Sequence, residues 1–239
     1  MNLIDHIDIV TTHKCNNNCP WCIDKFIHSD TREVDLAKVD EFLRKIPAKD
    51  GTEVLLLGGE PTMLDSSKLI ELAHIIYQNN YIPIMSTNGI NRKKIVEILP
   101  HYRWIQITVY NDKQIEYWKK YRNRINIKLS GDSTLTMDKI KWFKEATKDF
   151  ERKSISMYFK PDWTELCTDE KVWKYLNNAD WKENGAYLYT FIDGIRYKRC
   201  ITGKTNVIDE PNVPKFYPNG NYNKTWNNEE MDDYLNLYQ

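Results

Sequence analysis

The chain has 239 residues, which is enough for one domain with a sizeable core and a small extension. Its 34 Lys and Arg balance its 34 Asp and Glu, so no bulk field favours nucleic acid or an anionic membrane as the partner. No run approaches the roughly 20 apolar residues of a membrane span, and residues 1–12 lack the basic start and long apolar run of a secretion signal, which predicts a cytoplasmic protein.

Short apolar runs of strand length alternate with segments whose apolar residues have helical spacing. The expected strands are His6–Thr12, Glu53–Gly58, Tyr81–Thr87, Arg103–Tyr110, Arg124–Ser130 and Ser154–Lys160. Candidate helix starts are Asp35, Asp65, Asn91 and Thr136, and a weaker helical segment covers Asp112–Arg122. Repeated βα units imply parallel strands with right-handed crossovers. We predict an α/β fold, a partial (β/α)6 TIM-like barrel, with a flat doubly wound sheet as the alternative.

Residues 166–239 are expected to form a small C-terminal extension to a core of residues 1–165. Helical spacing at Thr168–Asn178 predicts a sixth helix. The segments Ala186–Ile192 and Ile195–Cys200 flank an Asp-Gly pair, which is typical of a β-hairpin. A turn-rich tail follows, and the spacing of Met231, Tyr234, Leu235 and Tyr238 predicts a terminal helix.

The segment CNNNCPWC places three cysteines directly after the first expected strand. These are Cys15, Cys19 and Cys22. Such crowding is unsuited to a disulfide framework, but thiolates suit iron–sulfur clusters and zinc. A four-iron cluster with three protein ligands would keep one iron open. Alternatively, His13 could complete a tetrahedral zinc site, so the spacing alone leaves both metals open.

Two further motifs end the second and third expected strands. The first is Gly58-Gly59-Glu60-Pro61, and the second is Ser86-Thr87-Asn88-Gly89. Singly, each is also a common turn sequence. All three motifs occupy the carboxyl ends of successive expected strands, which is the face where barrels of this kind build active sites.

Together the three motifs resemble the radical S-adenosylmethionine (radical SAM) superfamily, over about residues 5–165. The resemblance implies one 4Fe–4S cluster on Cys15, Cys19 and Cys22, and reductive cleavage of S-adenosylmethionine to a 5′-deoxyadenosyl radical that abstracts hydrogen from a substrate. It also implies an external one-electron reductant such as flavodoxin or ferredoxin. The implied cofactor contacts are Trp21, Gly58, Gly59, Glu60, Ser86, Asn88 and Thr108.

Alternation along the fourth to sixth expected strands predicts an apolar face toward the helices and a polar face toward the barrel interior. The polar set is Gln106, Thr108, Tyr110, Asn126, Lys128, Ser130, Ser156, Tyr158 and Lys160. It favours a polar substrate, a peptide or a small molecule such as a nucleoside. Lys128 and Lys160 could meet a phosphate or carboxylate group. The same side chains could instead bond to each other and to buried water, or the lysines could reach solvent.

Cys200 ends a segment, DGIRYKRC, that resembles part of the auxiliary-cluster extensions of peptide-modifying members. Their full cysteine pattern is absent, so we predict a single cluster and expect Cys167 and Cys200 to be isolated thiols. Cys200 could instead donate a hydrogen atom to a product radical. Two other functions remain open: an activase that installs a glycyl radical on a partner protein, and a non-catalytic zinc-binding module.

Overall fold

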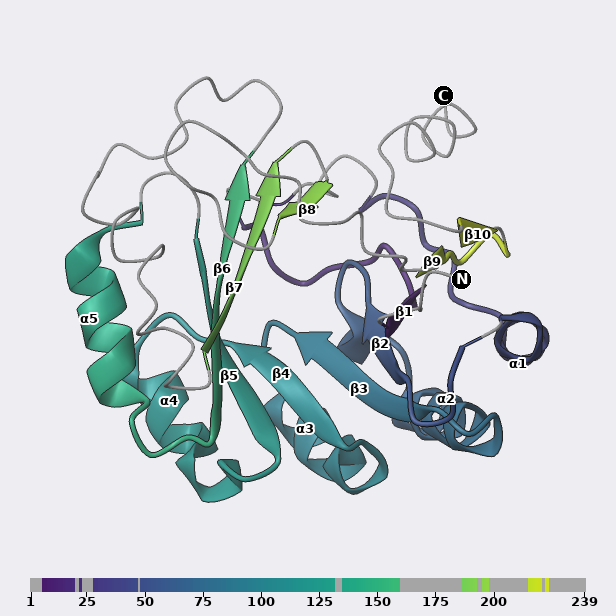
Figure 1. The fold of residues 1–239 in the computed structure, drawn as a ribbon, viewed down its shortest axis with the longest axis horizontal. Coiled ribbons are helices and arrows are strands. Elements are labelled where there is room, and N and C mark those ends of the chain that lie inside the picture. The colour runs from purple at the N-terminus through teal and green to yellow at the C-terminus, as the bar shows by residue number, and fades with distance from the viewer. Residues whose placement is uncertain are drawn as a thin grey trace. The chain divides into compact units, whose positions relative to one another are not determined.

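The computed structural model describes residues 6–19, 22, 28–46, 48–131, 135–159, 186–192, 195–197, 215–220 and 222–223 (Figure 1). The chain forms two compact units. The first comprises Met1–Gln106 with Pro211–Trp226, and the second comprises Ile107–Glu210 with Asn227–Gln239. Strand β4 (Trp104–Thr108) carries the chain from the first unit into the second.

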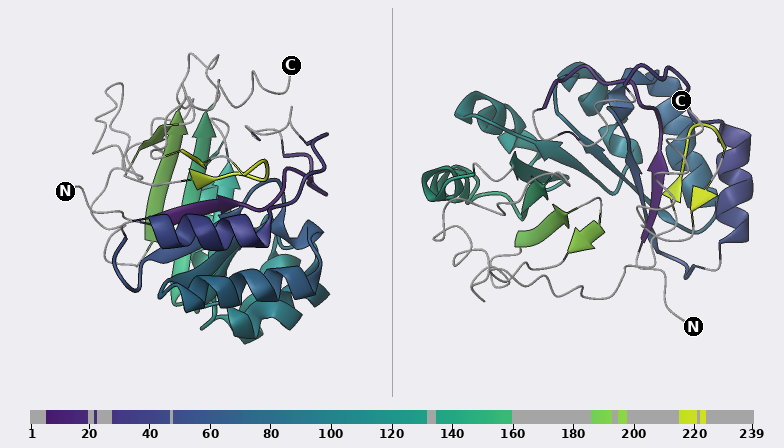
Figure 2. Two further views of the ribbon diagram at one scale, coloured as in Figure 1. Left: turned by 90° about the vertical axis from the view of Figure 1, so that its right-hand side faces the viewer. Right: turned by 90° about the horizontal axis from the view of Figure 1, so that it is seen from above.

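The first unit is built on three parallel strands in chain order. They are β1 (His6–Val10), β2 (Glu53–Leu57) and β3 (Ile82–Thr87). Its helical segments are α1 (Leu36–Lys45), η2 (Pro61–Met63), α2 (Ser66–Gln78), α3 (Arg92–Ile98) and η3 (Leu99–His101). Figures 1 and 2 show α1, α2 and α3 along one face of this sheet. That placement follows from right-handed crossovers between parallel strands.

Local sequence signals explain why the first helix forms where it does. The Asp35 carboxylate accepts hydrogen bonds from the amides of Ala37 (2.9 Å) and Lys38 (3.2 Å), which satisfies donors that a helix start leaves free. Val39 and Leu43 of α1 are buried, as are Ile9 of β1 and Val54 and Leu56 of β2. The three predicted strands are confirmed, each with slightly shorter bounds.

A short strand from far along the chain completes the outer edge of β1. Strand β9 (Lys215–Phe216) pairs in parallel with β1, and β10 (Tyr222–Asn223) pairs antiparallel with β9 (Figure 2). The Phe216 ring lies 5.1 Å from the Phe42 ring of α1, centroid to centroid. The sequence analysis predicted only a surface tail here, because two-residue strands are too short to show alternation.

The second unit also has parallel strands. They are β5 (Ile125–Gly131), β6 (Arg152–Phe159) and β7 (Ala186–Ile192), with β8 (Ile195–Tyr197) antiparallel to β7. Its helical segments are α4 (Asp112–Trp118), η4 (Lys119–Tyr121) and α5 (Met137–Ala146). The β7–β8 hairpin was predicted, but its parallel pairing with β6 was not. The predicted sixth and terminal helices lie outside the described residues, and the division at residue 165 stays a prediction.

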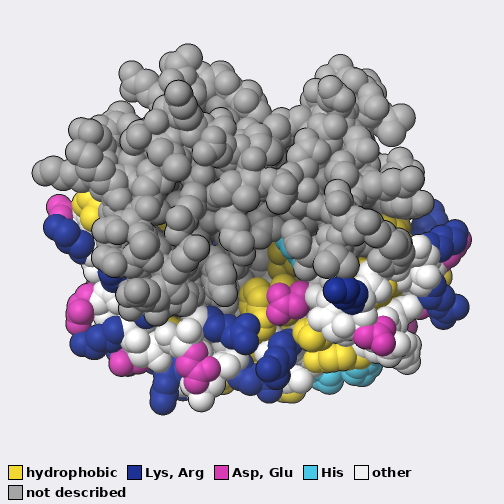
Figure 3. Space-filling model, in the orientation of Figure 1, with side chains coloured by type: hydrophobic (Ala, Val, Ile, Leu, Met, Phe, Trp, Pro, Cys, Tyr) yellow, Lys and Arg dark blue, Asp and Glu magenta, His cyan; other side chains and the backbone are white. Residues whose placement is uncertain are grey.

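The described surface carries both signs of charge. Figure 3 shows Lys and Arg side chains interspersed with Asp and Glu over the described part of one face, which agrees with the balanced composition. Within the described residues, no helix has the length and apolar character needed to cross a membrane. The cytoplasmic location stays a prediction.

Candidate functional site

The three predicted motifs follow β1, β2 and β3, so they share the edge of the first unit where these parallel strands end. Backbone hydrogen bonds join the first two motifs, because the Gly59 amide donates to the Thr12 carbonyl and the Glu60 amide donates to the Lys14 carbonyl, both at 2.8 Å. The third motif reaches the same loop, where Asn88 Nδ2 donates to Asn16 Oδ1 at 2.8 Å. All three motifs therefore meet at the cysteine loop.

The two glycines allow this close approach. A Cβ atom at Gly58 would lie 2.3 Å from the Thr12 carbonyl oxygen, and the φ of Gly58 is +133°. A Cβ atom at Gly59 would lie 2.3 Å from the His13 carbonyl oxygen and 2.4 Å from that of Lys14. These obstacles are backbone atoms, which cannot rotate away. The glycine pair is thus needed to seat the cysteine loop, whatever else it contacts.

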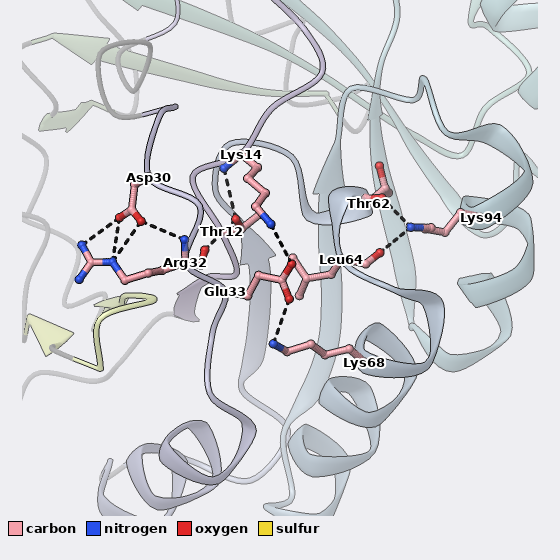
Figure 4. Close-up of polar contacts among 9 residues, drawn as sticks. All are labelled: Thr12, Lys14, Asp30, Arg32, Glu33, Thr62, Leu64, Lys68 and Lys94. Atoms are coloured by element: carbon pink, nitrogen blue, oxygen red, sulfur yellow. Dashed lines mark hydrogen bonds and ion pairs between the residues drawn. The ribbon is translucent and has the colours of Figure 1, made fainter.

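The chain returning from the cysteine loop holds the opposite side of the same segment. The Val34 amide donates to the Thr11 carbonyl at 2.8 Å, and Thr12 Oγ1 donates to the Arg32 carbonyl at 2.9 Å. Arg32 in turn pairs with Asp30 through its guanidinium and its backbone amide (Figure 4). Residues 11–14 therefore lie between the Gly-Gly-Glu-Pro motif that follows β2 and residues 32–34, where the chain returns from the cysteine loop.

Glu33 links the cysteine loop to α2. One carboxylate oxygen lies 3.3 Å from Lys14 Nζ, and the other lies 3.2 Å from Lys68 Nζ (Figure 4). Burial alone would raise the pKa of Glu33, but the hydrogen bonds from Lys68 and Lys14 outweigh it and lower the pKa from its ordinary 4.5. This carboxylate is therefore ionised near neutrality and cross-links the two elements.

The Glu60 side chain joins the ends of β2 and β3. It is 1% exposed. Its Oε1 accepts from the Thr62 amide (3.1 Å), Thr62 Oγ1 (2.6 Å) and Thr87 Oγ1 (2.5 Å), and its Oε2 accepts from the Asn88 amide (2.8 Å). These bonds fix the backbone from which the Asn88 side chain reaches the cysteine loop. The contact of Glu60 with the cofactor stays a prediction.

The start of α3 braces the turn that follows Glu60. Lys94 Nζ donates to the carbonyls of Thr62 (3.0 Å) and Leu64 (2.5 Å), as Figure 4 shows. Asn91 Nδ2 donates to the Thr62 carbonyl and hydroxyl at 3.1 and 2.9 Å. These bonds give donors to the turn carbonyls and link the two strand ends in one connected network.

The thiols of Cys15, Cys19 and Cys22 are partly exposed, and the Cys22 amide donates to the Cys19 carbonyl at 3.2 Å. Burial raises the pKa of the Cys15 thiol, with smaller contributions from nearby Glu60 and Cys19. Three such thiols on one anchored loop fit the donor set of a 4Fe–4S cluster, in which each of three irons takes one thiolate. Among the described residues, no three His, Cys, Asp or Glu gather around a single-ion site, so the structure does not assemble the zinc set with His13.

The other predicted site residues fall in several places. Ser86 Oγ donates to Gln106 Oε1 at 3.3 Å at the end of β3. Thr108 and Lys128 belong to the second unit, where each is 7% exposed. Trp21, Lys160 and Cys200 lie outside the described residues.

Three site residues escaped the sequence analysis. Asn16 accepts from Asn88, Glu33 binds two lysines, and His28 places Nε2 3.6 Å from the sulfur of Cys22. Asn16 was visible as part of the spacer between cysteines. Glu33 and His28 belong to no recognisable sequence pattern, because their contacts form only when the chain after the cysteines folds back beside Lys14 and Cys22.

The family model of the Radical SAM superfamily matches residues 9–165. The chain belongs to the radical SAM superfamily. Two GTP 3′,8-cyclases of Clostridium perfringens, from strains SM101 and 13, are 32% identical to it over 44% of this chain. The match covers only 38% of the length of these curated relatives.

Solved structures of anSMEcpe share the fold. Native anSMEcpe with bound AdoMet gives a TM-score of 0.60 at 16% identity, covering 92% of this chain and 73% of that one. Its complex with AdoMet and the Cp18Cys peptide gives 0.57 at 16% identity, over 81% and 73%. The predicted partial TIM-like barrel, with a parallel sheet that is not closed, is confirmed, as is the prediction of a radical SAM enzyme. The non-catalytic zinc module is therefore set aside.

Proposed function

We propose that this radical SAM enzyme holds one 4Fe–4S cluster on Cys15, Cys19 and Cys22 and uses it to cleave S-adenosylmethionine reductively. The observation that carries the proposal is the anchoring of the cysteine loop. The amides of Gly59 and Glu60 donate to the carbonyls of Thr12 and Lys14, just before the first cysteine. The Asn88 side chain donates to Asn16, which lies between the first two cysteines. A cluster bound there would be fixed to the ends of both β2 and β3.

When bound, the cluster supplies one electron that breaks the bond between sulfur and C5′ of S-adenosylmethionine, giving methionine and a 5′-deoxyadenosyl radical that takes a hydrogen atom from the substrate. The chain's own residues position and enclose the reactants. Gly58, Gly59 and Glu60 would line one side of the cofactor, and Ser86 and Asn88 another. Trp21 and Thr108 would complete the contacts.

We propose a polar substrate, either a peptide or a small molecule such as a nucleoside. The support is an unusual burial pattern in β5, where Asn126, Lys128 and Ser130 are 6–8% exposed on the strand face opposite buried Ile127 and Leu129. Lys128 brings a positive charge to this face, and an anionic group of a substrate would suit it. Lys160 and Cys200 keep their predicted roles as substrate contact and hydrogen-atom donor.

The cluster proposal is tested on protein purified without oxygen and reconstituted with iron and sulfide. The measurements are iron per chain and 5′-deoxyadenosine formed from S-adenosylmethionine with dithionite. Replacing Cys15, Cys19 and Cys22 by Ala should abolish both, whereas the matched variant Cys167→Ala should retain both. Retained iron and product in the triple variant would contradict the ligand assignment.

The substrate proposal is tested by adding GTP or a cysteine-containing peptide to the reconstituted protein and measuring 5′-deoxyadenosine formation. These probes follow from two similar proteins, a GTP 3′,8-cyclase and anSMEcpe, whose solved structure contains a bound peptide. A true substrate should raise product formation, and Lys128→Met should weaken that stimulation while sparing the basal reaction. A glycyl-radical activase would instead respond to neither probe and would require a partner protein.

A further inference from the structure

One contact beside the cysteine loop has no role in the function proposed above. The Nε2 atom of His28 lies 3.6 Å from the sulfur of Cys22, which is hydrogen-bonding distance for a sulfur acceptor. Both side chains are partly exposed. His28 follows the last cysteine of the motif by six residues, and two residues later Asp30 binds the backbone amide and side chain of Arg32.

We propose that His28 donates a hydrogen bond from Nε2–H to the Cys22 sulfur and raises the reduction potential of the cluster that Cys22 holds. The inference rests on the proposed cluster. A thiolate that ligates iron is deprotonated, so it can only accept a hydrogen bond, and the imidazole must be the donor. Once the cluster is present, the hydrogen bond can therefore run only from His28 to Cys22.

The direction of the effect follows from charge. Reduction adds one negative charge to the cluster, and a donor aimed at a ligand sulfur stabilises that added charge. Losing the donor should therefore make the cluster harder to reduce. For a single neutral N–H···S bond we expect a change of up to about tenfold in the ratio of reduced to oxidised cluster, which is about 59 mV for a one-electron couple.

His28 would thus be a positioning and tuning residue, since it acts through Cys22 and does not touch the reacting carbon. The returning limb explains its placement. Arg32 and Val34 are tied to Thr12 and Thr11, so the chain after Cys22 must come back alongside the loop it has just left. The bonds of Arg32 and Val34 that anchor the cysteine loop would thus also bring His28 beside Cys22, the last of the three cysteine ligands.

The test compares two substitutions at residue 28 with one control. His28→Phe keeps a planar ring without a donor, His28→Gln restores an N–H at similar reach, and His74→Gln alters an exposed histidine of α2. The midpoint potential of each reconstituted protein is measured by electron paramagnetic resonance during a redox titration. Iron per chain is measured in parallel.

We expect His28→Phe to lower the midpoint potential, His28→Gln to recover part of the difference, and His74→Gln to match the wild type. Unchanged potential in His28→Phe at full iron content would overturn the inference while leaving the cluster proposal intact. An equal fall in His28→Phe and His28→Gln would also overturn it, because a steric effect would then suffice. If the wild-type protein takes up no cluster, the proposed function itself fails.

Discussion

Gly59→Ala should disrupt the support of the cysteine loop. The new Cβ atom would lie 2.3 and 2.4 Å from two carbonyl oxygens, about 1 Å inside the lower end of ordinary contact at 3.4 Å. Because both obstacles are backbone atoms, the segments must separate. The bonds from Gly59 to Thr12 and from Glu60 to Lys14 would then break or lengthen.

The expected loss follows from these two bonds. Each contributes about 1 kcal/mol net, and each leaves a partly buried donor if it breaks, so the free energy of unfolding should fall by about 2–4 kcal/mol. For a chain of this size, that corresponds to a fall in melting temperature of about 5–15 °C. Urea unfolding measures the first quantity, and iron per chain after reconstitution reports on the loop itself.

The matched control is Gly131→Ala at the end of β5. Its Cβ atom would meet only the Leu135 side chain, at 3.3 Å and beyond, and neither glycine has a positive φ. The two variants therefore differ mainly in what the new methyl group meets. If Gly59→Ala were no less stable than Gly131→Ala and bound iron normally, the close approach of backbone would not explain the glycine.

Three further substitutions test the supports of the cysteine loop and of β1. Glu60→Gln should lower the free energy of unfolding by about 1–3 kcal/mol, because an amide cannot accept all four hydrogen bonds of the buried carboxylate. The pKa of Glu33 is lowered in the folded state, so the stability that this carboxylate adds is present above its ordinary pKa of 4.5 and is lost as the pH falls through its pKa in the folded protein. Glu33→Gln should therefore lose less stability than the wild type between about pH 6 and pH 3. Phe216→Ala should cost about 3–5 kcal/mol, because the ring is 2% exposed and packs on Phe42.

Each of these has an outcome that would contradict it. Equal stability of Glu60→Gln and the wild type in urea would mean that the carboxylate is not needed to join the strand ends. Parallel pH profiles for Glu33→Gln and the wild type would remove Glu33 from the acid-sensitive groups. A loss below about 1 kcal/mol for Phe216→Ala would show that β9 adds little to the edge of β1.

The sequence predicted the parallel strands well because their residues carry strong local signals. Ile7, Ile9, Val54 and Leu56 form alternating apolar patterns that match their burial, and Asp35 caps α1 as its position indicates. The cysteine loop and the two strand-end motifs were also recognisable, because their chemistry requires particular residues at short spacing.

The sequence could not reveal contacts that depend on how distant segments return. Nothing local marks Lys215 and Phe216 as partners of Asp8 and Ile9, since they are more than 200 residues apart. The role of Glu60 shows the same limit in another form. Its motif could not show that the carboxylate would also bind Thr62, Thr87 and Asn88 and so join two strand ends.

The pairing of β9 with β1 has a consequence for the order of folding. The cysteine loop is attached directly to β1, yet among the described residues the strand that pairs with the outer edge of β1 is residues 215–216. On the ribosome, the loop would therefore emerge early, while its strand kept an open edge until most of the chain had been made. Open strand edges invite pairing with other chains. Cluster insertion into the nascent protein would therefore compete with aggregation, and a chaperone or a late assembly step would favour the intact enzyme.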